Sequence, residues 1–339
     1  MTAGSTLPPL DSHRARQLVT RFADASVVIV GDVMLDQFLV GRVDRISPEA
    51  PVPIVTFERE QWRIGGAGNV AHNVAALGGR VRLVGAAGPD AAGERLAAEL
   101  RTHGIGTDGL ITDGTRRTTT KVRVVTNRNQ QVARIDYETD AEIGRAVETG
   151  VLARVAELAT DARAIVVSDY LKGVVTRGLM TRLIELARAQ RIPLLVDPKI
   201  PHLEYYAGAT FITPNHHEAE IATHRRIRTD EDAQAGAHLL REHVGTDGVL
   251  ITRGEHGMWL LDGEFDGRLA ATAREVADVT GAGDTVIATL ALALAAGATS
   301  AEAACLANHA AGVVVGKFGP ATVTPTELLE ATTHRTAEL

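Results

Sequence analysis

The 339-residue sequence contains one cysteine, Cys305, which excludes an internal disulfide framework and fits a reducing compartment. Residues 1–20 lack the apolar core of a secretory signal, and no apolar run is long enough to cross a membrane. Positive charge is not in excess: the formal net charge is −7, which argues against binding to nucleic acid or to a membrane surface. The twelve histidines show no metal-ligand spacing. We therefore expect a soluble, cytoplasmic protein.

Short runs of β-branched residues alternate with helix-like patterns along most of the chain. Such alternation predicts an α/β protein with a mostly parallel sheet and helices on both faces. Most of the runs end in glycine or a polar residue, as at Asp32, Asp197 and Asn215. Ligands of open parallel sheets bind beyond the carboxyl ends of the strands, so these side chains are expected to gather around a site.

Two segments, residues 38–62 and 118–137, break this alternation. Each contains two strand-like runs around a turn, which predicts hairpin-like strand pairs. We expect both pairs to form a small β-sheet lid on one edge of the main unit. No linker or repeat divides the chain, so residues 1–339 are expected to form a single domain. The polar tail beyond about Leu328 is expected to fray.

The most informative run is residues 278–285, Asp-Val-Thr-Gly-Ala-Gly-Asp-Thr, which precedes an apolar Ala/Leu pattern. Its glycines predict a tight turn that opens into a helix, whose first N–H groups lack intrahelical partners and lie at the positive end of the helix dipole. Such a turn is suited to bind an anion, which glycine allows to approach closely. A carboxylate placed there, Asp284, suits a general base that acts beside a developing negative charge. The alternative is an ordinary helix cap with glycines for the turn.

Four motifs occur in a fixed order: Gly65-Gly66-Ala67-Gly68-Asn69-Val70-Ala71, Asn215-His216-His217-Glu218, Thr252-Arg253-Gly254-Glu255-His256-Gly257 and residues 278–285. Together they resemble the signatures of the ribokinase-like (PfkB) carbohydrate kinases, over nearly the whole chain. The resemblance implies a ribokinase-like α/β fold with a mostly parallel central sheet, helices on both faces and a small β-sheet lid. It also implies an ATP-dependent kinase that phosphorylates a sugar hydroxyl.

Further runs resemble the members of this family that act on D-glycero-D-manno-heptose 7-phosphate in ADP-heptose synthesis. These runs are residues 31–36, 45–53, 128–131, 168–173, 197–199 and 311–317. The resemblance implies phosphorylation at the anomeric hydroxyl, which gives the 1,7-bisphosphate. A nucleotidyltransferase domain follows the kinase in many relatives, whereas this sequence has no HxGH motif. It thus resembles the stand-alone kinases, which implies that another protein carries out the adenylyl transfer.

The resemblance also implies roles on the nucleotide side. Asp284 is the expected base, and the expected anion hole for the γ-phosphoryl group consists of Gly281, Ala282 and Gly283. The expected ATP-binding residues are Asn215, Glu218, Thr252, Gly254, Gly257, Asp278, Thr280 and Asn308. Glu218 is also the expected Mg²⁺ ligand, because Mg²⁺ prefers a carboxylate and retained waters; a monovalent-cation requirement stays open.

Three of these residues have a structural alternative. Asn215 and Glu218 fit the cap and the third residue of a helix, a role that is compatible with ATP binding. Asn308 fits a helix-buried amide.

On the sugar side, the resemblance implies that hydroxyl groups are bound by Asp36, Gly65, Gly66 and Asn69. A carboxylate and an amide suit a polyol, whose donors and acceptors must all be matched once water is excluded. A plain turn is the alternative for the glycine pair. The distal phosphate needs cations, and about two are expected from four candidates: Arg128, Arg134, Lys172 and Lys199. By analogy, the lid strands are also expected to form a homodimer contact.

Other functions stay open at this point. A kinase for another sugar or sugar phosphate would share the catalytic half, and a sugar- or nucleotide-binding regulator would keep the fold without the chemistry. Residues 66–71 also fit a loose dinucleotide fingerprint, GxGxxA, although a dehydrogenase would carry it directly after the first core strand. The intact Asp284 with its glycines argues for an enzyme, because a binding protein has no need of the base.

Overall fold

The computed structural model describes residues 5–128, 130–273, 276–317, 319 and 321–333. Its main sheet has ten strands within these residues, in the order β1-β14-β13-β12-β11-β10-β9-β2-β5-β6. The strands are β1 Ser5–Thr6, β2 Ser26–Gly31, β5 Arg80–Ala87, β6 Leu110–Thr112, β9 Ala164–Ser168, β10 Leu194–Asp197, β11 Phe211–Ile212, β12 Gly248–Thr252, β13 Met258–Leu261 and β14 Asp266–Leu269. Only β13 pairs antiparallel with both of its neighbours, so this described sheet is mostly parallel, as the alternation predicts.

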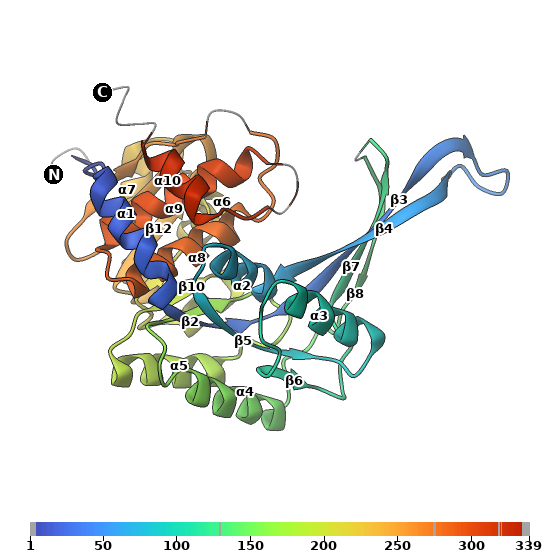
Figure 1. The fold of residues 1–339 in the computed structure, drawn as a ribbon, viewed down its shortest axis with the longest axis horizontal. Coiled ribbons are helices and arrows are strands. Elements are labelled where there is room, and N and C mark those ends of the chain that lie inside the picture. The colour runs from blue at the N-terminus through green and yellow to red at the C-terminus, as the bar shows by residue number, and fades with distance from the viewer. Residues whose placement is uncertain (1–4, 129, 274–275, 318, 320, 334–339) are drawn as a thin grey trace.

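Helices cover both faces of this sheet (Figure 1). The helices are α1 Ser12–Thr20, α2 Ala67–Ala76, α3 Ala91–Thr102, α4 Arg145–Leu158, α5 Arg177–Gln190, α6 His216–Thr223, α7 Asp230–Val244, α8 Ala282–Ala295, α9 Ser300–Val315 and α10 Pro325–Thr333. Alternate residues of β2 enter two different cores: Val27 and Ile29 pack with α2, α8 and α9, whereas Val28 and Val30 pack with α4 and α5. A strand buried on both faces needs a continuous apolar run, which β2 has.

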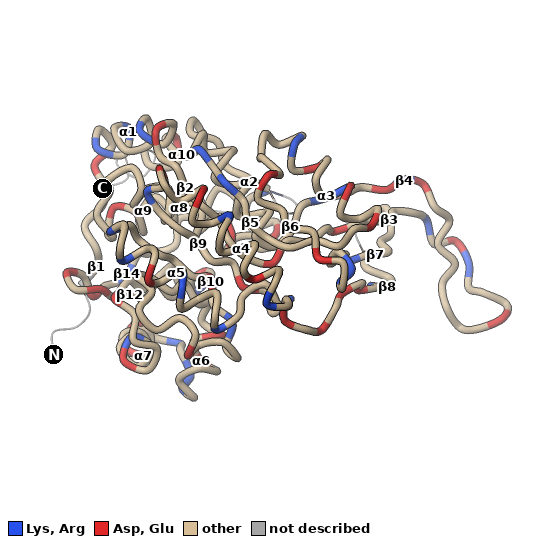
Figure 2. The backbone as a smooth tube through the Cα atoms, turned by 90° about the horizontal axis from the view of Figure 1, so that it is seen from below, with Lys and Arg blue, Asp and Glu red and all other residues tan. Residues whose placement is uncertain are grey.

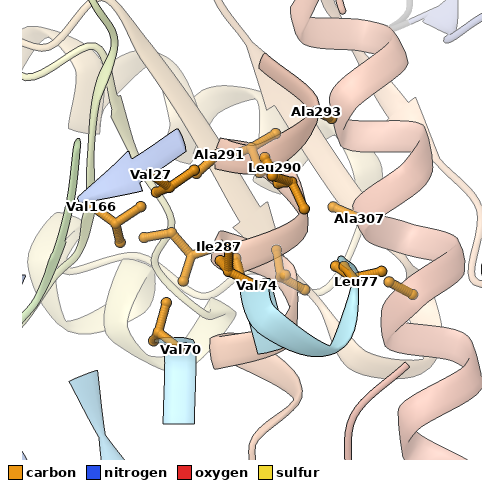
Figure 3. Packing of buried hydrophobic residues seen from close by; sticks show 14 of the residues in the cluster. Val27, Val70, Val74, Leu77, Val166, Ile287, Leu290, Ala291, Ala293 and Ala307 are labelled. Carbon is orange, nitrogen blue, oxygen red and sulfur yellow. The ribbon is translucent and has the colours of Figure 1, made fainter. Parts of the chain in front are cut away.

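The core beside residues 278–285 is formed by small and branched side chains. Figure 3 shows Val27 and Val166 of the sheet facing Ile287 of α8, with Val74 of α2 close by. Every residue of α8 from Asp284 to Ala293 is buried, which explains why its sequence is apolar all round. The start of α8 is therefore fixed against the sheet.

A second sheet of four strands in the described residues has the order β4-β3-β7-β8. It consists of β3 Val33–Ile46, β4 Pro53–Gly66, β7 Thr120–Thr126 and β8 Gln131–Tyr137. The pairs β3–β4 and β7–β8 are antiparallel, as predicted, and β3 pairs parallel with β7. Figures 1 and 2 show this sheet reaching away from the main body, with charged residues along its strands. We call it the small sheet; its action as a lid, and the single-domain assignment, stay predictions.

Two expected boundaries were wrong. The first strand pair is longer than residues 38–62, because β3 begins at Val33, directly after the main-sheet strand β2, and β4 continues to Gly66. The chain is helical beyond Leu328: α10 continues to Thr333, and Leu328 and Thr332 are both buried. The rest of the predicted tail, residues 334–339, lies outside the described residues. No helix among the described residues is long and apolar enough to span a bilayer.

Candidate active site

The predicted anion-binding turn lies at the beginning of α8. Gly281 is the N-cap with a φ of 79°, a left-handed conformation that glycine adopts without strain. No described side chain caps this helix; the N–H of Ala282 donates to the carbonyl oxygen of Val279 at 3.2 Å, which leaves the later N–H groups of the first turn for an anion. The alternative, in which Asp284 is an ordinary helix cap, is wrong, because Asp284 is the third residue of the helix and its carboxylate is bound elsewhere.

The Asp284 carboxylate is 5% exposed and accepts two side-chain hydrogen bonds. Its Oδ2 accepts from Nδ2 of Asn69 at 2.6 Å, and its Oδ1 accepts from the hydroxyl of Tyr170 at 2.8 Å. Burial raises the pKa of Asp284 above its ordinary value, although these bonds and the charge of Lys199 oppose the rise. A raised carboxylate pKa suits a base that must accept a proton near neutral pH.

A cavity of about 160 Å³ opens beside Asp284. Its lining residues are Tyr170, Asp197, Lys199, Thr213, Asn215, Glu218, Thr252, Gly281, Gly283 and Asp284. Three carboxylates in so small a space repel one another. Burial raises the pKa of Asp197 to about 8, and the charges of Asp284 and Glu218 add to the rise while Lys199 opposes it. We call this space the acidic cavity; it favours a bound cation.

Lys199 and Glu218 form an ion pair of 2.6 Å in the acidic cavity. Burial alone would lower the pKa of Lys199, but the charges of Asp197 and Glu218 outweigh it and the pKa is raised. Asn215 and Glu218 also form a capping box at the beginning of α6, and Asn215 forms a parallel bridge with Thr252. The cap interpretation of Asn215 and Glu218 is therefore confirmed, and the cap places both residues on the cavity wall.

A larger cavity of about 540 Å³ adjoins the acidic cavity, since Thr252 and Gly283 line both. Predicted site residues that line it are Thr252, Gly254, Gly257, Ala282, Gly283 and Asn308. Asn308 is 4% exposed and its Nδ2 donates to the carbonyl of Ala270 at 2.8 Å, so it is a helix-buried amide at the cavity wall. The size of this larger cavity and its mixed polar and apolar wall suit a nucleotide.

Asp278 and Thr280 lie outside the lining of both cavities. Asp278 instead stabilises the turn before α8: its carboxylate accepts from the N–H of Thr280 at 2.9 Å and of Gly319 at 3.0 Å. Asp278 and Thr280 therefore shape the turn before α8 and do not line a cavity.

On the sugar side, the small sheet brings Asp36 against the glycine pair. A Cβ on Gly65 would lie 3.0 Å from Oδ2 of Asp36, and a Cβ on Gly66 would lie 2.2 Å from the carbonyl oxygen of Asp32. Gly66 has a φ of 58° and is the N-cap of α2, so the plain-turn interpretation holds for it as well. Asp36 forms an ion pair with Arg123 of β7.

The four candidate cations do not meet at one place. Lys199 lies in the acidic cavity, whereas Arg134 pairs with Asp136 at 2.7 Å and Lys172 pairs with Glu138 at 2.8 Å beside the small sheet. Arg128 is exposed in the turn between β7 and β8. Its neighbour Asn129, part of the same predicted motif, lies outside the described residues.

Three residues near the site were given no role from the sequence: Lys121, Arg123 and Tyr170. Lys121 neighbours Asp36 on one side and Asp136 on the other in the strand register. Burial lowers the pKa of Lys121, with Arg134 and Lys172 contributing. The spacing of Lys121 and Arg123 by two residues places both on one sheet face, a signal that the sequence does contain.

The family model of pfkB family carbohydrate kinases matches residues 24–327. The chain belongs to this family. The four motifs predicted this membership, and with it an enzyme of the carbohydrate kinase class, and both predictions are confirmed.

Solved structures with a similar fold confirm the fold of this chain. Phosphofructokinase-2 from Escherichia coli in complex with potassium has a TM-score of 0.76 at 20% identity, covering 92% of this chain and 99% of that one.

Arabidopsis thaliana ribokinase, complexed with ribose and ATP, has a TM-score of 0.71 at 20% identity, covering 91% of this chain and 99% of that one. These likenesses confirm the ribokinase-like fold. Among curated relatives, bifunctional protein HldE of Citrifermentans bemidjiense is 44% identical over 326 residues, which are 96% of this chain and 67% of the relative. HldE of Geobacter sulfurreducens is 46% identical over 321 residues, 94% of this chain and 65% of the relative. The chain thus spans about two thirds of the length of these relatives.

Proposed function

We propose that this carbohydrate kinase transfers the γ-phosphoryl group of ATP to the anomeric O1 of D-glycero-D-manno-heptose 7-phosphate. The observation that carries the chemistry is the buried Asp284 carboxylate at a helix N-terminus, in the wall of the acidic cavity, which adjoins the larger cavity at Thr252 and Gly283. The motif resemblance to heptose 7-phosphate kinases supports the substrate, as does the similarity to the HldE proteins.

The chain's own residues account for the proton and the charge. Asp284 accepts the proton of the O1 hydroxyl as O1 forms its bond to the γ-phosphorus, and the bond from that phosphorus to the β–γ bridging oxygen breaks as ADP leaves. The first turn of α8, from Gly281 to Gly283, stabilises the negative charge on the transferring group. Positioning supplies much of the rate, because the nucleotide in the larger cavity and the sugar beside the small sheet are both held against the fixed carboxylate of Asp284.

The acidic cavity fits Mg²⁺. Glu218 and Asp197 bring two carboxylates, and Asn215 an amide oxygen, to one space. Mg²⁺ commonly takes one or two protein carboxylates and completes its coordination with substrate phosphates and waters. When bound, Mg²⁺ neutralises charge on the β- and γ-phosphates. Lys199 adds a fixed positive charge at the same place.

The distal phosphate of the sugar is assigned to the cationic face of the small sheet. Lys121 and Arg134 lie there beside Asp36, the expected hydroxyl ligand, and Lys172 follows β9 close to them. Lys199 is better placed for the phosphoryl group, since it lines the acidic cavity with Asp284. Closure of the small sheet over the sugar would exclude water as a competing acceptor.

We also propose a cytoplasmic homodimer that associates through the small sheet. Large apolar side chains are exposed on its strands, among them Ile46, Phe57, Ile135 and Tyr137. Exposed apolar groups gathered on one sheet are typical of protein contacts. Sedimentation of the purified protein tests the assembly, and a monomer at micromolar concentration would contradict it.

The test of function is an ADP-release assay with ATP and Mg²⁺. Heptose 7-phosphate is compared with fructose 6-phosphate, ribose and no sugar, for the wild type, Asp284→Asn and Asp161→Asn. Asp161 is an exposed aspartate between α4 and β9 and serves as the matched control. We expect turnover with the heptose phosphate alone, reduced roughly 10²- to 10⁴-fold in Asp284→Asn and unchanged in Asp161→Asn. Turnover with another sugar would overturn the substrate, and ATP binding without sugar-dependent turnover would indicate a regulator.

A further inference from the structure

We propose that Tyr170 is a positioning residue that holds the Asp284 carboxylate for proton transfer, an inference that rests on the proposed function. The Tyr170 hydroxyl donates to Oδ1 of Asp284 at 2.8 Å, while Nδ2 of Asn69 donates to Oδ2 at 2.6 Å. A donor on each oxygen fixes the plane of the carboxylate. Each oxygen keeps a further lone pair, so one can still accept the proton of a sugar hydroxyl.

The loop that carries Tyr170 is held by buried carboxylates. Asp32, 1% exposed, accepts from the N–H of Tyr170 at 2.8 Å, of Lys172 at 3.0 Å and of Val174 at 2.9 Å. Asp169 accepts from the N–H of Leu171 at 2.8 Å, and Leu171 has a φ of 55°. A non-glycine residue in this left-handed conformation is costly and persists only where its surroundings enforce it. The loop is therefore ordered before any substrate binds.

Tyr170 is suited to donate a hydrogen bond, and it does not act as a base. Burial raises its pKa well above the ordinary tyrosine value, and the charges of Asp284 and Asp197 raise it further. The phenol therefore stays protonated throughout the working pH range. The Lys199 ammonium lies 5.5 Å from the centre of the Tyr170 ring, within the range of a cation–π contact.

The charged groups around Asp284 come from several elements. Asp36 of β3 and Lys199, which follows β10, act on its carboxylate in opposite directions, and Asp197 and Glu218 act on Tyr170. None of these replaces the hydrogen bond that Tyr170 donates. Removing that donor must destabilise the ionised form of Asp284, whereas a stronger donor must stabilise it.

The opposite effects on the pKa of Asp284 of removing and of strengthening this donor give the test. In Tyr170→Phe we expect kcat with heptose 7-phosphate to fall roughly 10- to 100-fold with little change in the KM of the sugar. The acid limb of kcat/KM should move to higher pH by about one pH unit. Replacement of Tyr170 by 3-fluorotyrosine, a stronger donor, should move the limb to lower pH. Tyr205→Phe is the matched control, since Tyr205 stacks on His202 and does not contact Asp284 in the structure.

A second measurement works without any sugar. With ¹³C-carboxyl aspartate labelling, the Asp284 signal is assigned by its loss in Asp284→Asn and titrated in the wild type and Tyr170→Phe. We expect a higher pKa of Asp284 in Tyr170→Phe and no change in Tyr205→Phe. If this shift appears but the heptose phosphate is not turned over, the proposed substrate fails and the role of Tyr170 stands. An unchanged Asp284 pKa, or acid limbs that do not move in opposite directions, would overturn the role of Tyr170.

Discussion

Asn69 and Asp284 are 215 residues apart in the sequence, yet Nδ2 of Asn69 donates to Oδ2 of Asp284 at 2.6 Å. This bond joins the beginning of α2, which follows the glycine pair, to the beginning of α8. Asn73, one turn after Asn69 in α2, connects the same two helices, because the Thr285 hydroxyl of α8 donates to its Oδ1 at 2.8 Å. The helix that follows the glycine pair and the helix that begins at residues 282–285 therefore share one buried network, and a change in one should act on the other.

Asn69→Asp should convert this contact into a pair of carboxylates. Two acids at hydrogen-bond distance cannot both ionise readily, so a proton should be shared between them and the pKa of the pair should rise. We expect kcat/KM at neutral pH to fall at least about tenfold and to recover partly as the pH rises. A pH–rate profile checks this, with Asn127→Asp on the exposed β7–β8 turn as the control. A flat loss at every pH would indicate disrupted packing instead.

Lys121→Met should weaken binding of the sugar phosphate but not of ATP. Lys121 lies between Asp36 and Asp136 on the small sheet, so its loss removes a cation from the proposed distal phosphate site. We expect the KM of the phosphorylated sugar to rise roughly tenfold or more, with the KM of ATP unchanged. Arg128→Met is the matched comparison, because Arg128 is exposed at the tip of the hairpin, and its variant should behave as wild type. The reverse result would place the distal phosphate at the hairpin tip.

The sequence predicted the layers, the small sheet and the anion turn because each has a local pattern. Alternating β-branched runs, a paired glycine and an apolar helix are visible within windows of some ten residues. The neighbours of Asp284 are not local: Tyr170 follows β9 and Asn69 begins α2, and only packing brings them together. The ion pair of Lys199 with Glu218 is likewise not visible in the sequence, in which Lys199 was one of four candidates for the sugar phosphate.

Gly66→Ala should destabilise the protein. Its φ of 58° disfavours any side chain, and a Cβ would lie 2.2 Å from the backbone oxygen of Asp32, which cannot move away cheaply. The conformation alone costs about 1–2 kcal/mol, and the clash adds to it. Denaturant unfolding should show a lower midpoint with an unchanged m-value. Gly263→Ala, in the exposed bend between β13 and β14 where a Cβ meets nothing within 4 Å, should change the free energy of unfolding by less than about 0.5 kcal/mol.

Asp197 should make the stability of the ligand-free protein depend on pH. Its folded pKa of about 8 is above the ordinary aspartate value, so the folded state binds more protons than the unfolded state between roughly pH 4 and pH 8. The contribution of Asp197 to stability is therefore fully present below pH 4 and is lost as the pH rises through 8, by at most about 1.4 kcal/mol per pH unit. Asp197→Asn removes this titration, so the difference in unfolding free energy between variant and wild type should grow in favour of the variant as the pH rises. Urea unfolding at pH 5, 7 and 9 in a chelating buffer measures it. A difference that stays constant across this range would mean that Asp197 is already ionised in the folded protein, and that Lys199 compensates its charge.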